Sequence, residues 1–182
     1  MYDFDKAQQL KIITNMYYFG NSYYGNFICI VLLRKLHMYC EVEMQVITRT
    51  ISIRSKGEGD MIDITSETSK ILSQSKLKDG TITIFVSGST AAVTTIEYEP
   101  GLRQDFPNML SRVVPRNIEY QHENMWHDGN GHSHVRASLI GPSLTIPFKD
   151  STLLLGTWQQ IVFLEMDISK RERNLILQIM GE

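Results

Sequence analysis

Short stretches of alternating apolar and polar residues constrain the fold of this chain most strongly. In residues 45–53, Ile47, Ile51 and Ile53 share one parity and threonine or serine fills the other, as in a half-buried strand. Further stretches of strand type, several separated by glycine, proline or aspartate, are residues 81–86, 92–96, 135–140, 143–148, 159–166 and 174–180. The chain is therefore expected to be built mainly from β-strands.

Two helices are predicted between these strands. The first follows Thr65, buries Ile71 and Leu72 and closes at Gly80. The second lies between Pro100 and Pro115, where apolar residues repeat at helical spacing. The expected class is α+β but mainly β, namely a β-sandwich with two inserted helices.

The chain changes character near Met44. Residues 1–43 form an extension of uncertain status with irregular aromatic content, and residues 44–182 form the predicted domain. The extension is open to interpretation as an upstream-start artefact, a docking arm or an added hairpin. Cys29, His37 and Cys40 fit no standard zinc spacing, so ordinary free cysteines are favoured over a metal site.

Charge and hydropathy exclude several classes of partner. The net charge of −2 argues against nucleic acid or an anionic membrane. The longest apolar run, residues 27–33, is too short for a bilayer, which needs about 20 residues. The basic pair follows this run, the wrong order for a secretory signal, so a cytoplasmic protein is expected. The charged run 170–173 is interpreted as a solvated turn.

Four of the five histidines lie between positions 122 and 134, and this segment carries the strongest chemical signal. Imidazoles are ligands for zinc and similar metals, and the turn 129–131 allows His122 to fold back toward His132 and His134. The alternative is a solvated loop, which is favoured for His127.

If the strand at 135–140 begins slightly early, His132, His134, Arg136 and Ser138 share one face. Val135, Ala137 and Leu139 would then point into a core. A metal beside an arginine suits a phosphate or diphosphate group, because the guanidinium offers fork-shaped donors.

Two further sites are weaker candidates. Glu97 and Glu99 stand at a strand end before a helix, where a carboxylate is either a ligand, a general base or a charge at the helix N-terminus. The turn 88–91 can offer backbone N–H groups to an anion.

Several motifs, in order from about Met44 to Glu182, make the chain similar to a known family. They are Ser89-Thr90-Ala91-Ala92-Val93-Thr94, residues 97–102, Asp128-Gly129-Asn130-Gly131-His132-Ser133-His134, residues 137–143, Leu155-Gly156-Thr157-Trp158-Gln159 and residues 178–182. The chain thereby resembles the YjbQ-like family, the so-called secondary thiamine-phosphate synthases, in its archaeal-type form.

The resemblance implies a homotrimeric β-sandwich with a histidine-lined pocket that binds a divalent metal, zinc or magnesium, in some members. It also implies an activity that joins a pyrimidine diphosphate to a thiazole phosphate with loss of pyrophosphate. The family's pattern carries onto Tyr120 and His122, onto Ser133-His134, onto Glu97 and onto residues 156–159. One departure is Gly88, where many bacterial members have histidine, and His132 is the expected substitute.

A transferase acting on small phosphorylated metabolites is therefore the leading hypothesis. Its expected metal ligands are His122, His132 and His134; its catalytic residues are Glu97 and Arg136; and its substrate-binding residues are Arg136, Ser138, Trp158 and Gln159. The alternatives are a non-catalytic trimer that binds a metal or an anionic metabolite, and a hydrolase in which Glu97 serves as base to a metal-bound water.

Overall fold

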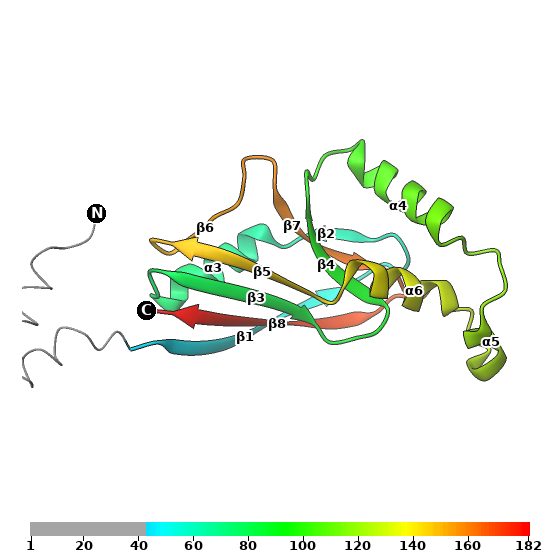
Figure 1. Cartoon of the computed structure of the whole chain (residues 1–182), viewed down its shortest axis with the longest axis horizontal. Coiled ribbons are helices and arrows are strands. Elements are labelled where there is room, and N and C mark those ends of the chain that lie inside the picture. The colour runs from blue at the N-terminus through cyan, green and yellow to red at the C-terminus, as the bar shows by residue number, and fades with distance from the viewer. Residues whose placement is uncertain (1–42) are drawn as a thin grey trace, which may run out of the picture. The chain divides into compact units, whose positions relative to one another are not determined.

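The computed structural model describes residues 43–182. The chain divides into two units, Met1–Glu43 and Met44–Glu182, and the unit Met44–Glu182 contains every helix and strand of the described residues (Figure 1). The expectations for the extension, including Cys29, His37 and Cys40, fall on residues outside this range. No helix within the described range is long and apolar enough to cross a membrane.

The strands form two antiparallel sheets, as Figure 1 shows. The larger sheet has the order β1 (Gln45–Arg54), β8 (Glu172–Gly181), β3 (Gly80–Val86), β5 (Ser143–Lys149) and β6 (Thr152–Leu153). The smaller sheet has the order β2 (Met61–Asp63), β7 (Gln160–Glu165) and β4 (Ala91–Ile96). The central strand β8 pairs with both β1 and β3.

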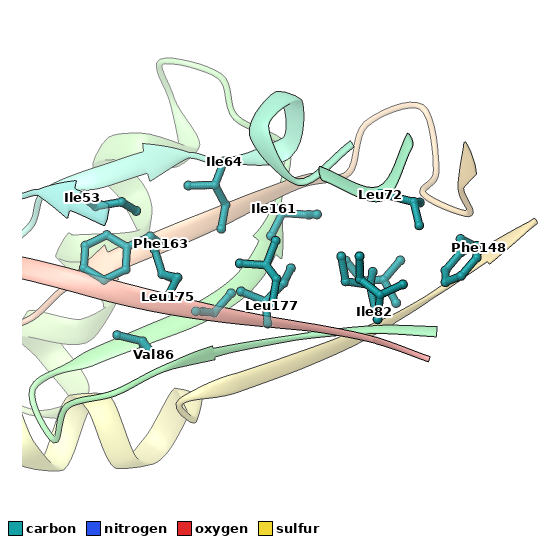
Figure 2. Close-up of a cluster of buried hydrophobic side chains, with 14 of the residues drawn as sticks. Ile53, Ile64, Leu72, Ile82, Val86, Phe148, Ile161, Phe163, Leu175 and Leu177 are labelled. Atoms are coloured by element: carbon teal, nitrogen blue, oxygen red, sulfur yellow. The ribbon is translucent and has the colours of Figure 1, made fainter. Parts of the chain in front are cut away.

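The main core lies where the inner faces of the two sheets meet. On β8 the residues Leu175, Leu177 and Ile179 are fully buried, while the residues between them are exposed or half-buried. Figure 2 shows Leu175 and Leu177 in one cluster with Ile161 and Phe163 of β7. Full burial of such a side chain stabilises a fold by about 1.5–3 kcal/mol. The alternating pattern read from the sequence therefore has its expected physical cause, and the β-sandwich is confirmed.

Strand β7 is buried on both faces, which explains its continuous apolar run. Ile161 and Phe163 belong to the main core, whereas Val162 and Leu164 belong to a second cluster. That second cluster is completed by helices α4 (Leu102–Val113) and α6 (Gly131–Ile140), which lie over the smaller sheet. The smaller sheet is thus the middle layer of the domain.

The first predicted helix is α3 (Thr65–Ser75), whose Leu72 is fully buried in the main core. It ends earlier than expected, because Lys76 adopts a left-handed conformation with φ of 64°. Gly80 instead begins β3, where a Cβ atom would overlap the backbone carbonyl of Met180.

The described residues contain four helices, two more than the sequence predicted. One of them is the short α5 (Gln121–Trp126), and the other is α6. The predicted strand at residues 135–140 is wrong, because this stretch is the second half of α6. Val135 and Leu139, expected in a core, are 46% and 59% exposed, and only Ala137 of the three is buried.

Candidate functional site

The loop between α5 and α6 brings two of the histidines together. His127 and Gly129 both have positive φ, which reverses the chain between the two helices. The Glu123 carboxylate accepts hydrogen bonds from the backbone N–H groups of Gly129 and Gly131, at 2.6 and 2.7 Å. The rings of His122 and His134 consequently lie with their centroids 4.4 Å apart and their planes at 45°. The predicted return of His122 toward the second half of the segment is present for His134.

His132 occupies a different environment, on the face of α6 that also carries Arg136. Residues four apart on a helix are neighbours, and both side chains reach Glu58. Arg136 Nη1 donates to Glu58 Oε1 at 2.6 Å, and its Nε donates to the carbonyl oxygen of Val114 at 3.0 Å. Arg116 Nη1 lies 3.2 Å from Glu58 Oε2, so two guanidinium groups compensate this one carboxylate.

Two histidine nitrogens in this region are buried without a hydrogen-bond partner. His132 Nε2 lies 3.3 Å from Glu58 Oε1, and His122 Nε2 lies 3.4 Å from Asp128 Oδ1. Both pairs are within ion-pair distance, but neither is aligned as a hydrogen bond. Buried polar atoms without hydrogen-bond partners are uncommon in proteins, and each one requires a structural or functional explanation.

Burial lowers the pKa of His132 below its usual value, although the neighbouring Glu58 carboxylate opposes this effect. Arg136 and Arg116 lower the pKa of His132 further, because a protonated imidazole beside these two positive charges is unfavourable. His132 is therefore biased toward the neutral imidazole, the form that accepts a proton or binds a metal.

The helical conformation of residues 131–140 separates the three predicted metal ligands into two groups. His122 and His134 form one pair, and His132 faces Glu58 on another side of α6. In residues 43–182, no group of three or more histidine, cysteine, aspartate or glutamate side chains is placed to hold one metal ion. Within one copy of residues 43–182 the three histidines therefore do not form one metal site, and no chemical step is assigned to a metal.

Three other predicted site residues lie at one end of the smaller sheet, and the histidine segment lies at the other end. Glu97 follows β4, and Trp158 and Gln159 precede β7; all three are exposed. In the register of β4 and β7, Ile96 pairs with Gln160 at this end, and Ala91 pairs with Glu165 at the other.

The histidine segment belongs to the Glu165 end. Asn130 Nδ2 donates to Asp167 Oδ2, and the backbone N–H of Gly59, next to Glu58, donates to the carbonyl oxygen of Glu165. Five residue steps along a strand span roughly 17 Å. One chain therefore does not bring Glu97 next to His132 and Arg136. Ser138 is exposed on α6, and no hydrogen bond from its side chain is present.

A buried ionic network beside this segment was missed by the sequence reasoning. Arg173 is 9% exposed and donates to both carboxylate oxygens of Glu165, at 2.6 and 2.9 Å, and to the Thr90 hydroxyl at 2.8 Å. Arg171 donates to Asp167 at 2.8 Å. The interpretation of residues 170–173 as a solvated turn agrees with the exposure of Lys170, Arg171 and Glu172 but is wrong for the buried Arg173. The available signal was the period-two spacing of Glu165 and Asp167 before the turn and of Arg171 and Arg173 after it.

Burial by itself would raise the pKa of Asp167. Hydrogen bonds from Arg171, from the Ser169 N–H and from the Thr90 hydroxyl outweigh that effect and lower the pKa. The same ion pair raises the pKa of Arg171.

The network also explains what surrounds Gly88. A Cβ atom at this position would lie 2.8 Å from Arg173 Nη1. Any side chain at position 88 therefore requires the guanidinium of Arg173 to shift. The expected substitute for a histidine at this position, His132, lies against Glu58.

Comparison with known proteins finds one family that matches most of the chain. The model for the family described as UPF0047 protein YjbQ-like matches residues 49–182. A UPF0047 protein of Methanothermobacter thermautotrophicus is 37% identical over 145 residues, which are 80% of this chain and 99% of the relative. YugU of Bacillus subtilis is 31% identical over 135 residues, covering 73% and 98% of the two chains.

Solved structures also match this chain in fold and in sequence. A crystal structure described as a YbjQ-like protein of unknown function from Sulfolobus solfataricus has a TM-score of 0.72 and 31% identity, covering 77% of this chain and all of the other. A hypothetical protein from Aeropyrum pernix has a TM-score of 0.69 at 31% identity, covering 75% and 99% of the two chains. The match by family model, by sequence and by structure means that this chain belongs to the YjbQ-like family, UPF0047.

Proposed function

We propose that this chain is a transferase of the secondary thiamine-phosphate synthase type, which joins a pyrimidine diphosphate to a thiazole phosphate. The observation that carries the proposal is the position of two pairs of side chains on α5 and α6: His122 lies beside His134, and His132 and Arg136 both reach Glu58. Imidazole and guanidinium groups are donors to phosphate oxygens, and two of these imidazole nitrogens have no partner in the fold.

In this reaction the thiazole nitrogen forms a bond to the methylene carbon of the pyrimidine while the bond from that carbon to the diphosphate oxygen breaks. The bonding electrons leave with pyrophosphate, so negative charge develops on the leaving group. Donors placed where charge develops lower the barrier. His122 and His134 would offer such donors, together with Ser138, which lies one turn after His134 on α6. Arg136, on another side of the helix, would hold a second phosphate group.

The remaining candidate residues would take part in the reaction only if several copies of the chain assemble. Glu97, Trp158 and Gln159 lie about a strand length from the histidines within one chain. In a homotrimer, as the resemblance implies, these residues of one protomer would meet the histidine segment of another. Exposed apolar side chains such as Val46, Phe85 and Met180 on the larger sheet are compatible with association of copies.

The test is turnover by the purified full chain, measured as pyrophosphate release together with thiamine phosphate formed. His134→Asn is expected to reduce the rate by about a hundredfold, the range for loss of a donor at a developing charge. His127→Asn, at an exposed position with positive φ that asparagine tolerates, is the matched control and should keep the wild-type rate. Tight binding of the diphosphate without any turnover would instead support the non-catalytic alternative.

Metal binding at His122, His132 and His134 stays a prediction. Its measurement is the zinc and magnesium content of the purified chain, compared between wild type and His134→Asn. Equal and stoichiometric metal in both proteins would exclude His134 as a ligand.

A further inference from the structure

A cavity of about 190 Å³ lies under α4, away from the paired histidines His122 and His134. Part of its lining is apolar and consists of Met61, Phe106, Leu110, Leu164 and Met166. Cavities of about 150 Å³ with such a lining accept a benzene ring. The space is therefore sufficient for one small ring or a branched alkyl group.

The rest of the lining is charged, and its charges are unequally compensated. Glu58 is neutralised by Arg136 and Arg116, and Glu165 by Arg173. Asp60 also lines the cavity, but its Oδ2 accepts only the backbone N–H of Lys56, at 2.8 Å. Among residues 43–182, no lysine, arginine or histidine side chain lies within ion-pair distance of Asp60, and its Oδ1 accepts no hydrogen bond.

An apolar cavity with one unpaired carboxylate in its wall favours a ligand that is apolar and carries a positive charge. An apolar body gains about 25 cal/mol for each Å² that it buries there. A cationic group gains from Asp60, whereas an anionic group finds no unpaired cation in the lining, because Arg136 is paired with Glu58. A purely apolar ligand would leave the carboxylate without a new partner.

We propose that this cavity binds a small primary amine whose aromatic or branched body lies against Phe106, Leu110 and Leu164 and whose ammonium group meets Asp60. The cavity is lined by Arg136 but not by His122 or His134, and the proposal does not depend on the transfer reaction. The proposal rests only on the shape and the charge of the cavity.

The test uses the full chain with benzylamine as the probe and benzyl alcohol as the neutral analogue of the same size, titrated by calorimetry at neutral pH. Benzylamine is expected to bind at least about tenfold more tightly, in line with a hydrogen bond to a charged group. Asp60→Asn should remove that advantage, because the asparagine oxygen still accepts the Lys56 N–H but carries no charge. Asp105→Asn, at an exposed position of α4, is the matched control and should keep it.

A second variant tests the place of binding. Ser111→Trp, at an exposed lining position of α4, is expected to block both ligands while leaving the unfolding transition intact. Equal affinity for benzylamine and benzyl alcohol would overturn the proposal, because the cavity would then be an apolar packing gap only. Absence of binding at millimolar concentration, or an equal loss in Asp60→Asn and Asp105→Asn, would also overturn it.

Discussion

At the scale of single residues, His132 links the environment of α6 to the pH dependence of stability. Burial lowers its pKa in the folded chain, whereas the unfolded chain keeps the ordinary value of 6.5. Between these two values the unfolded chain binds more protons, so the free energy of unfolding falls as the pH falls through this window. Above 6.5 both states are neutral and the contribution is constant.

His132→Asn should therefore flatten the loss of stability between pH 7.5 and pH 5.5, measured by urea unfolding at both values. His127→Asn changes an exposed histidine and should keep the wild-type slope. An unchanged slope in His132→Asn would mean that the Glu58 carboxylate cancels the effect of burial.

Arg173 gives the second residue-scale prediction. Removing one partner of a buried ion pair leaves the other charge uncompensated and costs about 3–5 kcal/mol. Arg173→Ala should lose stability in this range, because Glu165 is fully buried. Arg54→Ala breaks an exposed pair with Glu172, at 3.7 Å, and should lose less than about 1 kcal/mol. Chemical unfolding of both variants makes the comparison, and equal losses would contradict it.

These residues also show where sequence reasoning succeeds and where it fails. The approach of His122 to His134 is predictable, because the glycines that reverse the chain lie between them in the sequence. The bond from Arg173 to Thr90 joins residues 83 positions apart, and no local pattern signals it. Local chain reversals can be predicted from residue type, but side-chain partners from distant strands cannot.

At the scale of elements, the strand predicted at residues 135–140 is wrong, because these residues belong to the helix α6 at residues 131–140. The three alternating apolar residues Val135, Ala137 and Leu139 suggested a strand, but the same residues fit a ten-residue helix, and periodicity over so few positions does not decide between them. The helix places Ala137 in the second core cluster beside Leu110, while Val135 and Leu139 face outward. The strands β1, β3 and β8 were predicted correctly because their alternation is long enough to exclude helical spacing.

Aspartate substitutions distinguish the two conformations in solution. A strand buries Val135, Ala137 and Leu139 alike, so each aspartate would be equally harmful. The helix predicts a loss of several kcal/mol for Ala137→Asp alone, since a buried charge without a partner is costly. Val135→Asp and Leu139→Asp should each change the free energy of unfolding by less than about 1 kcal/mol. Thermal and urea unfolding of the three variants test the prediction.

At the scale of the whole molecule, the sandwich of residues 44–182 contains two hydrophobic clusters of described residues, and the family match begins only at residue 49. A chain that starts at Met44 should therefore fold alone. Its free energy of unfolding is expected within about 1 kcal/mol of the value for the full chain. Insolubility of this shorter chain, or a sharply lower melting point, would show that residues 1–43 belong to the fold.

Assembly is the last question at this scale, because the candidate residues occupy opposite ends of the smaller sheet. If one reaction centre uses both ends, Glu97 must come from one protomer and His134 from another. Glu97→Ala and His134→Ala should then each be inactive alone, yet recover activity when co-expressed. Random mixing leaves one intact pairing in four, so about a quarter of the wild-type rate is expected.

The co-expressed mixture has a clear control and a clear contradiction. Mixing Glu97→Ala with unmodified chains measures how freely protomers exchange, and light scattering reports whether the mixed particles are trimers. A mixture no more active than either variant, with exchange demonstrated, would mean that Glu97 and His134 do not share a centre across the interface. The histidine segment would then act without Glu97, and the reaction would depend on residues at the Glu165 end of the sheet alone.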